Sequence, residues 1–221
     1  LWEYNRIVLD PALTAVSGII LNWGYLLGVG IVWAAHWQGP ALILCLVALN
    51  LLAVALISMF YFKADPAVLR VVMRQLQGTV YIPVLLSFLI LIRAGDAGMT
   101  WIFFVLAIVF AGDTSAYYVG SYWGRHKLSP AISPGKTIEG SLGGLAANLA
   151  VGAIGKALFF PGLSWATSIL FFLAVGAAGQ MGDLFESEMK RFSGIKDSSS
   201  LLPGHGGILD RIDALLFASP V

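Results

Sequence analysis

Charged side chains are scarce in this chain. Aspartate, glutamate, lysine and arginine make up 11% of its 221 residues, and hydrophobic residues make up 58%. Ordinary soluble domains carry roughly 25% charged residues. This composition, with a mean hydropathy of +0.85, excludes an ordinary water-soluble domain and indicates an integral membrane protein. The net charge of +1 gives no reason to expect a nucleic-acid partner, and we expect none.

Cysteine and histidine are scarce as well. The single cysteine, Cys45, excludes an internal disulfide and a zinc site built from cysteines. It lies in an apolar run, where we expect it to contribute to packing. With three histidines in the chain, a metal site would depend mainly on oxygen ligands.

Long apolar runs occupy most of the chain. The longer ones have about 20 residues, enough for a helix to cross about 30 Å of hydrocarbon. We predict an all-α, polytopic transmembrane helix bundle that forms one domain over residues 1–221. At least seven membrane segments are visible, at residues 12–35, 41–62, 79–92, 100–120, 138–160, 164–181 and 208–221. Because the chain starts at Leu1 and stops at Val221, inside a run, we expect truncation at both ends.

Residues 63–78 interrupt the apolar pattern. Charged and polar residues such as Lys63, Arg70 and Arg74 alternate with valines and leucines. This spacing predicts an amphipathic helix on the membrane surface. An ordinary polar loop is the alternative.

Lysine and arginine predict which side of the membrane each loop faces. If the runs alternate across the membrane, eleven of the 13 basic residues fall on one side, and only Arg93 and Lys156 fall on the other. Basic loops are typical of the cytoplasmic side. We therefore expect an inner-membrane protein, bacterial in type, whose functional site faces the cytoplasm.

Charge is concentrated in one stretch, residues 182–213. Ten of the chain's 25 charged residues lie in these 32 residues. Charges are costly at membrane depth, so such a cluster suggests a functional site. The sequence predicts an enzyme that handles phosphates with the help of a metal ion.

The spacing of the acidic residues supports a metal site. Asp210 and Asp213 are three residues apart, so in a helix both carboxylates share a face, and Asp183, Glu186 and Lys190 can share another. Two acidic helix faces brought together would form an oxygen-rich pocket of the kind that Mg²⁺ prefers. The alternative is a set of ion pairs, such as Glu186 with Lys190.

A glycine-rich loop, residues 203–207, leads into the last helix. Its glycines allow backbone amides to approach a phosphate, and a helix N-terminus favours anions. His205 within it could contact phosphate or transfer a proton. An ordinary glycine turn is the alternative.

Two further residues lie outside this stretch. Asp113 follows an apolar run and either faces the same pocket or hydrogen-bonds within the bundle. Lys136 lies in a segment, residues 133–137, that is similar to the end of a Walker A loop. Pro130 stands where that motif needs glycine, so a P-loop is excluded, but Lys136 remains a candidate for phosphate binding.

These residues resemble the phosphatidate cytidylyltransferase family, whose members are also called CDP-diacylglycerol synthases. The family signature is S-x-x-K-R-x4-K-D, a short spacer, and H-G-G-x-x-D-R-x-D. The matching residues are Ser187, Lys190, Arg191, Lys196, Asp197, His205, Gly206, Gly207, Asp210, Arg211 and Asp213, and serines 198–200 lie in the spacer. Residues 112–117, 133–137 and 2–4 are also similar to family segments. The resemblance sets the catalytic region at residues 112–213.

The resemblance implies phospholipid biosynthesis: CTP and phosphatidic acid would give CDP-diacylglycerol and pyrophosphate. It also implies Mg²⁺, with room for a second cation, and a homodimer among membrane lipids. The implied metal ligands are Asp183, Asp210 and Asp213. The implied catalytic residues are Lys190, Arg191, His205, Asp210 and Arg211. The implied substrate-binding residues are Asp113, Lys136, Ser187, Lys196, Asp197, Gly206 and Gly207.

Three other functions compete with this one. A CTP-dependent polyprenol or phytol kinase would share the nucleotide, but the complete H-G-G-x-x-D-R-x-D match argues against it. A CDP-alcohol phosphotransferase would need a D-G-x-x-A-R pattern, which is absent. A membrane ion transporter would spread its charges along several helices, whereas here they gather in one stretch.

Overall fold

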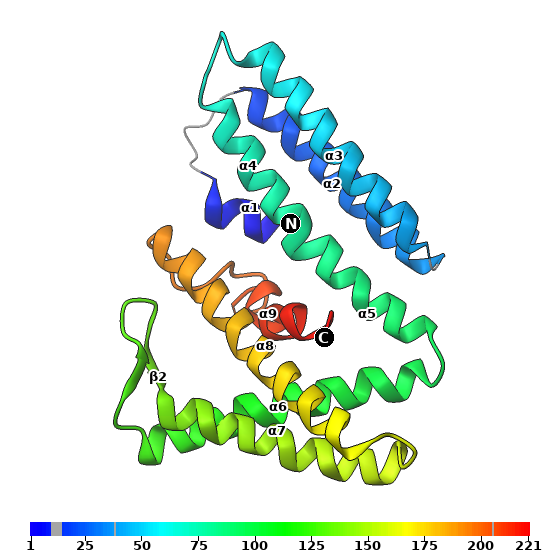
Figure 1. Ribbon diagram of the computed structural model, residues 1–221. Helices are drawn as coiled ribbons and strands as arrows, with labels where there is room; N and C mark the ends of the chain where they lie inside the picture. The colour runs from blue at the N-terminus through cyan, green and yellow to red at the C-terminus, as the bar shows by residue number, and fades with distance from the viewer. Residues whose placement is uncertain (10–14, 38, 205) are drawn as a thin grey trace.

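The computed structural model describes residues 1–9, 15–37, 39–204 and 206–221, and most of them are helical (Figure 1). The helices are α1 Trp2–Val8, α2 Ala15–His36, α3 Pro40–Tyr61, α4 Val68–Thr79, α5 Leu85–Ala94, α6 Gly98–Trp123, α7 Ile138–Phe159, α8 Trp165–Phe192 and α9 Leu209–Ala218. Between α6 and α7, strands β1 Lys127–Ser129 and β2 Ser133–Thr137 pair antiparallel. This β-hairpin is an addition to the all-α bundle that the sequence predicts.

Six helical segments in the described part of the chain are long and apolar enough to cross a membrane. They are Gly18–His36, Pro40–Tyr61, Val68–Ala94, Gly98–Trp123, Ile138–Phe159 and Trp165–Phe192. The prediction of a polytopic helix bundle is confirmed, but the count of at least seven is wrong for the described residues. The last expected segment contains α9, whose 10 residues give about 15 Å of helix, half the hydrocarbon thickness.

The segment expected to lie on the membrane surface does not stand alone. The amphipathic helix predicted there is present as α4, and it continues through a π-helical turn, η1 Val80–Val84, into α5. Pro83 lies in that turn, where its missing N–H removes one helical hydrogen bond without ending the helix. The predicted surface helix and the third apolar run are therefore parts of one long helix.

A buried polar network ties α4 to α2 and α3. Asn50 is fully buried, and its amide bonds with Gln75 and Thr79 of α4, at 3.2–3.3 Å. The indole N–H of Trp23 on α2 donates to the same asparagine at 3.1 Å. Polar side chains that satisfy one another in this way stabilise helix contacts inside a membrane.

Small residues allow α6, α7 and α8 to approach closely. A Cβ added to Gly140 would lie 2.7 Å from the carbonyl oxygen of Ala116, and one on Gly144 would lie 2.9 Å from that of Gly112. The glycines of α7 therefore bring its backbone close to that of α6. At the other end of α7, Gly152 and Gly155 leave room for the rings of Phe172 and Phe104.

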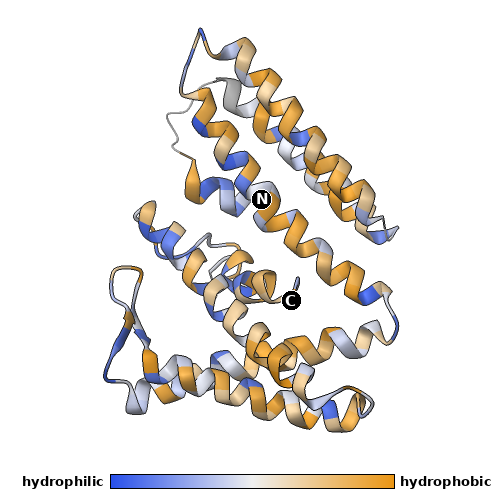
Figure 2. Ribbon diagram, viewed as in Figure 1, coloured by the Kyte–Doolittle hydropathy of each residue, from blue (hydrophilic) through white to orange (hydrophobic). Residues whose placement is uncertain are grey.

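The polar parts of the chain gather at one end of the bundle. Figure 1 shows α1, the β-hairpin and the C-terminal end of α8 on the left, and the C-terminal ends of α2, α5 and α7 on the right. In Figure 2 the hydrophilic residues concentrate on the left-hand elements, whereas α2, α3 and α5 are mostly hydrophobic. This agrees with the expectation that the basic loops share one side of the membrane.

Candidate active site

A cavity of about 430 Å³ opens at this polar end. Its walls come from α6, the β-hairpin, α7 and α8. Three charged residues line it: Asp113 of α6, Lys136 of β2 and Asp183 of α8. The other lining residues are Ala116, Tyr117, Gly120, Ser121, Leu128, Ser133, Gly135, Thr137, Gly140, Ser141 and Gln180. The cavity therefore combines small residues, hydroxyl groups and charges of both signs.

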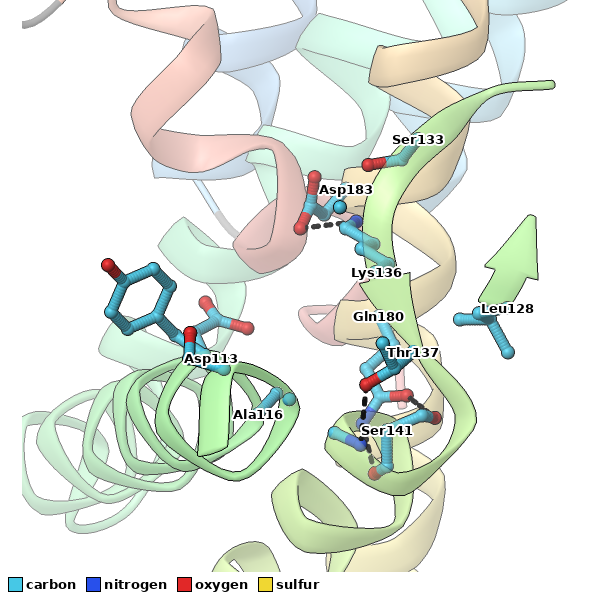
Figure 3. A pocket seen from close by; sticks show the side chains of 14 residues that line it. Asp113, Ala116, Leu128, Ser133, Lys136, Thr137, Ser141, Gln180 and Asp183 are labelled. Carbon is cyan, nitrogen blue, oxygen red and sulfur yellow. Dashed lines mark hydrogen bonds and ion pairs between the residues drawn. The ribbon is translucent and has the colours of Figure 1, made fainter. Parts of the chain in front are cut away.

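Lys136 and Asp183 form an ion pair across the cavity wall. Lys136 Nζ lies 2.5 Å from Asp183 Oδ2, and Figure 3 shows the two side chains pointing toward one another, with Asp113 on the opposite helix. The Nζ atom itself is buried, and in the described structure it makes no hydrogen bond that meets normal geometry. With Asp183 as its one ion-pair partner in the described structure, the ammonium group of Lys136 can leave this carboxylate and bind a phosphate that enters the cavity.

The β-hairpin that carries Lys136 is fixed at both ends. At its base, the side chain of Glu139 accepts hydrogen bonds from the amides of Arg125 and His126 and contacts the His126 ring at 2.6 Å. Thr137 caps α7, since its hydroxyl accepts from the amide of Gly140. Near the tip, Arg191 Nε of α8 donates to the carbonyl of Ile132 at 3.2 Å. Arg191 thus holds the hairpin against α8.

Asp210, in the first turn of α9, is an anchor for the loop before it. Its carboxylate accepts from Lys190 Nζ at 2.8 Å, from the Ser198 hydroxyl at 2.9 Å and from the amides of Ser198 and Gly207 at 3.0 and 2.7 Å. Burial would raise the pKa of Asp210, but these hydrogen bonds and those with Glu186 hold it well below its usual range. Both oxygens of this carboxylate are therefore already occupied by protein donors.

Asp213, one turn further along α9, has a different environment. It is buried, and this burial together with the negative charges of Asp183 and Asp113 raises the pKa of Asp213 to about 7. Asp113, Asp183 and Asp213 thus lie close enough to repel one another. A positive charge placed among them would relieve that repulsion.

These carboxylates fit a hard cation in chemistry, although their present spacing is not that of a coordination shell. In the described part of the chain, no group of three His, Cys, Asp or Glu residues is arranged to hold a metal ion. Lys136 supplies the positive charge next to Asp183 instead. A cation bound by Asp183 and Asp213 would require Lys136 to move away from Asp183. For Asp210 to become a ligand as well, its carboxylate would have to release the protein donors that it now binds.

Comparison with known proteins identifies the family. A sequence model of the cytidylyltransferase family matches residues 1–221. The chain belongs to the cytidylyltransferase family. It is 41% identical, over 142 residues, to the phosphatidate cytidylyltransferase of Bacillus subtilis (strain 168), which covers 64% of this chain and 53% of the relative. The proteins of that name from Staphylococcus saprophyticus and from Staphylococcus aureus (strain COL) are 41% and 43% identical over 138 residues, 62% of this chain and 52% of each relative.

The chain therefore spans about half the length of the curated relatives it matches. The expected family membership is confirmed by the match over the whole chain.

The structure divides the expected site residues between two places, and the described residues of the signature itself lie outside the cavity lining. Asp113, Lys136 and Asp183 line the cavity, whereas Lys190 pairs with Asp210 and also lies 2.5 Å from the buried Glu186. The Glu186–Lys190 ion pair that was the alternative interpretation is thus present. Lys196, Asp197 and Arg211 are exposed and Ser187 is half-buried, and none of these four lines the cavity. His205 lies outside the described residues.

The glycines of the signature are explained by the anchored loop. Gly206 has φ +78°, a conformation that side chains other than glycine rarely adopt, and a Cβ there would lie 2.7 Å from Asp210 Oδ2. A Cβ on Gly207 would lie 2.0 Å from the hydroxyl oxygen of Ser198. Both glycines therefore allow the loop to close around the Asp210 carboxylate. Their predicted contact with substrate remains a prediction.

Sequence reasoning missed several residues of this region. Gln180 and Ser141 line the cavity and bond to each other in both directions, since the Ser141 hydroxyl donates to Gln180 Oε1 and Gln180 Nε2 donates to the Ser141 carbonyl. Gln180 precedes Asp183 by three residues, so helical spacing could have found it. Ser198 and Ser199 belong to the spacer of the signature. They are buried, and their hydroxyl groups donate to the carboxylates of Asp210 and Glu3. No sequence pattern predicts these contacts.

Proposed function

We propose that this chain carries the catalytic region of a phosphatidate cytidylyltransferase, which converts CTP and phosphatidic acid into CDP-diacylglycerol and pyrophosphate. The observation that carries the proposal is the cavity at the polar end of a membrane bundle. There, a lysine from the hairpin meets a carboxylate from α8. The curated relatives bear the name of this enzyme.

In the proposed reaction, an oxygen of the lipid phosphate attacks the α-phosphorus of CTP. The bond from this phosphorus to the bridging oxygen of the β-phosphate breaks, and pyrophosphate leaves with the electron pair. The lipid phosphate is already ionised, so the protein needs no nucleophile of its own. Its task is to position the two substrates and to offset negative charge.

The chain's basic residues would share this task. Lys136 projects into the cavity and would bind a phosphate once released from Asp183. Arg191, Lys190 and Arg211 lie at the same end of the molecule, and their charge lowers the cost of bringing CTP next to an anionic lipid. Lys190 would act while still paired with Asp210, which keeps its ammonium group at a fixed place.

We further propose that the reaction depends on Mg²⁺, held by Asp183 and Asp213, with Asp210 as a supporting residue and room for a second cation. When bound, a divalent cation would neutralise phosphate oxygens in the cavity. The support for this is the mutual repulsion of Asp113, Asp183 and the buried Asp213, and the preference of Mg²⁺ for oxygen ligands.

We also propose that the protein forms a homodimer. It would lie in the bacterial inner membrane, with the cavity facing the cytoplasm. Cross-linking of the purified protein in lipid nanodiscs tests the dimer.

The deciding experiment follows both products. Purified protein in nanodiscs is incubated with CTP labelled in the cytidine ring or in the γ-phosphate, with phosphatidic acid and Mg²⁺, with and without a chelator. We expect cytidine label in the lipid fraction, γ label in pyrophosphate, and loss of both with the chelator. Transfer of γ label to an added polyprenol, with release of CDP, would instead establish a CTP-dependent kinase and overturn the proposal.

A further inference from the structure

Helix α1 is docked firmly against the functional end of the molecule. Tyr4 is fully buried, and its hydroxyl donates to the carbonyl of Arg74 on α4 at 3.0 Å. On the other flank, the hydroxyl of Ser193, just after α8, donates to the carbonyl of Ile7. These two contacts hold α1 from both sides and set the place from which Glu3 projects.

Glu3 of α1 points into the start of α9. It is 7% exposed, and its Oε1 accepts from the Ser199 hydroxyl at 2.5 Å and from the amide of Ile208 at 2.9 Å. Its Oε2 accepts from the amide of Leu209 at 2.7 Å. No lysine, arginine or histidine side chain of the described residues forms an ion pair with it.

A buried carboxylate without a cation needs strong hydrogen bonds, and a helix N-terminus provides them. The first amides of α9 have no partner within their own helix, and the helix dipole favours a negative charge at this end. Glu3 satisfies two of these amides from more than 200 residues away along the chain. It therefore caps α9 in place of a local residue, and indeed no side chain at the N-cap position, Ile208, does so.

We propose that Glu3 is a positioning residue for the two aspartates of α9. Asp210 follows Leu209 directly, and its carboxylate accepts hydrogen bonds from the amides of Ser198 and Gly207. Glu3 accepts hydrogen bonds from Ser199, Ile208 and Leu209, the neighbours of those residues. The two carboxylates together form a clamp that holds residues 198–199 next to residues 207–209. A Cβ on Gly207 would meet Glu3 Oε1 at 2.4 Å, so this glycine serves the clamp as well as the loop.

The clamp links α1 to the region where the negative charges of Asp183 and Asp213 act on one another. Gly182 lets α9 lie directly against α8, because a Cβ there would come within 2.5 Å of the Asp213 carbonyl. A shift of the α9 N-terminus would thus move Asp213 relative to Asp183. The consequence for turnover rests on the proposed function, whereas the clamp itself does not.

Glu3→Gln tests the clamp. The side chain keeps its size, but its amide group places a donor against at least one N–H or O–H group that now donates to Glu3. Hydrogen–deuterium exchange is measured without substrates on the peptides that cover residues 206–212. We expect faster exchange at the amides of Ile208 and Leu209, with exchange in α6 and α7 unchanged.

Turnover is measured on the same preparation. We expect kcat to fall roughly 10- to 100-fold, since a displacement of about 1 Å at a catalytic group has effects of that size. The KM for CTP should stay nearly unchanged, because Lys136 and Asp113 belong to elements that Glu3 does not touch. If the protein made no CDP-lipid at all, the exchange measurement would still decide whether the clamp exists.

Asp65→Asn is the matched control. Asp65 also accepts a backbone amide ahead of a helix, from Ala67 at 2.9 Å, but in the loop before α4. It should leave exchange at residues 208–209 and kcat as they are. Ser199→Ala, which removes one donor and keeps the carboxylate, should give a smaller rise in exchange than Glu3→Gln. Unchanged exchange at 208–209 in Glu3→Gln would overturn the proposal, and so would a uniform rise throughout the protein.

Discussion

At the residue scale, the Lys136–Asp183 pair is the part of the cavity most directly open to test. Both side chains are only partly exposed, at 25% and 37%, so their charges are less screened by water than those of a surface pair. Each also has a separate proposed role, Lys136 toward phosphate and Asp183 toward a cation. A variant of Lys136 should therefore mainly weaken the use of the phosphate substrates, whereas a variant of Asp183 should weaken cation binding.

Lys136→Ala should lower kcat/KM for CTP or phosphatidic acid by roughly 10- to 100-fold. A hydrogen bond to a charged group contributes about 1.5–3 kcal/mol, and about 1.4 kcal/mol corresponds to a tenfold change. Lys127→Ala is the control, because this exposed lysine lies on the other strand of the same hairpin and does not line the cavity. Equal effects of the two variants would show that Lys136 contributes only general positive charge.

Asp183→Asn should reduce kcat by orders of magnitude and weaken Mn²⁺ binding measured by electron paramagnetic resonance. Loss of about 4 kcal/mol of transition-state stabilisation would lower the rate about a thousandfold. Asparagine keeps the shape of the side chain, so the melting temperature should change little. Near-normal turnover, or Mn²⁺ binding equal to that of the unmodified protein, would contradict the role given to Asp183.

Asp210→Asn should instead lower the melting temperature. The carboxylate accepts hydrogen bonds from Lys190, Ser198 and Gly207. An asparagine side chain accepts only through its oxygen, because its nitrogen is a donor. A buried donor without a partner costs about 1–3 kcal/mol in free energy of unfolding. A stable Asp210→Asn protein that no longer binds Mn²⁺ would show that Asp210 is a metal ligand rather than an anchor.

Asp183 and Asp210 have similar positions in the sequence pattern but different surroundings in the structure. This difference shows how much helical spacing alone could predict. The acidic residues of α8 and α9 were assigned to one region, and the structure does bring them close together, since Lys190 pairs with both Glu186 and Asp210 and the charge of Asp183 acts on Asp213. Spacing along a helix gives the face that a carboxylate occupies, but not the donors that reach it from elsewhere. Glu3 lies more than 200 residues from α9, so its contacts there could not be derived from local patterns. Ser198 reaches Asp210 through an irregular loop, where no helical spacing applies.

At the element scale, hydropathy predicted the membrane helices better than the connections between them. Six of the apolar runs correspond to spanning helices. Residues 63–78 and 79–92 were predicted as separate segments, yet α4 and α5 are continuous through a π-helical turn that contains Pro83. The β-hairpin was predicted only as a basic loop, because strands of three and five residues are too short for a periodic pattern to show.

The contact between α8 and α9 depends on one glycine. Gly182→Ala adds a Cβ that would lie 2.5 Å from the Asp213 carbonyl oxygen and 3.0 Å from Phe217 Cβ, so the two helices must separate. Overpacking of this kind costs about 1–3 kcal/mol, and we expect a lower melting temperature together with reduced turnover. Gly162→Ala is the control, since nothing lies within 4 Å of a Cβ at that position. A Gly182→Ala protein as stable and active as the Gly162→Ala protein would contradict this close contact.

At the scale of the whole molecule, the distribution of charge follows from the bilayer. The spanning helices expose large apolar side chains, such as Leu26, Phe60 and Phe103, which lipid can cover. Charged residues at the centre of a span would be costly, and hydrophilic residues gather at the end that carries α1, the hairpin and the C-terminal end of α8. An enzyme that joins a water-soluble nucleotide to a lipid phosphate needs its site at such a boundary, because neither substrate leaves its own phase.

This arrangement predicts a sidedness that labelling can measure. With Cys45, which is exposed, first replaced by alanine, single cysteines are placed at Lys127, Lys196 and Gly162. The positive-inside rule and the eleven basic residues on one side predict that the first two react with an impermeant thiol reagent only from the cytoplasm. Gly162 follows α7 at the opposite end and should react only from outside. If Lys127 and Lys196 were labelled from different sides, the hairpin and the α9 loop could not serve one cavity, and the assignment of the site would fail with the topology.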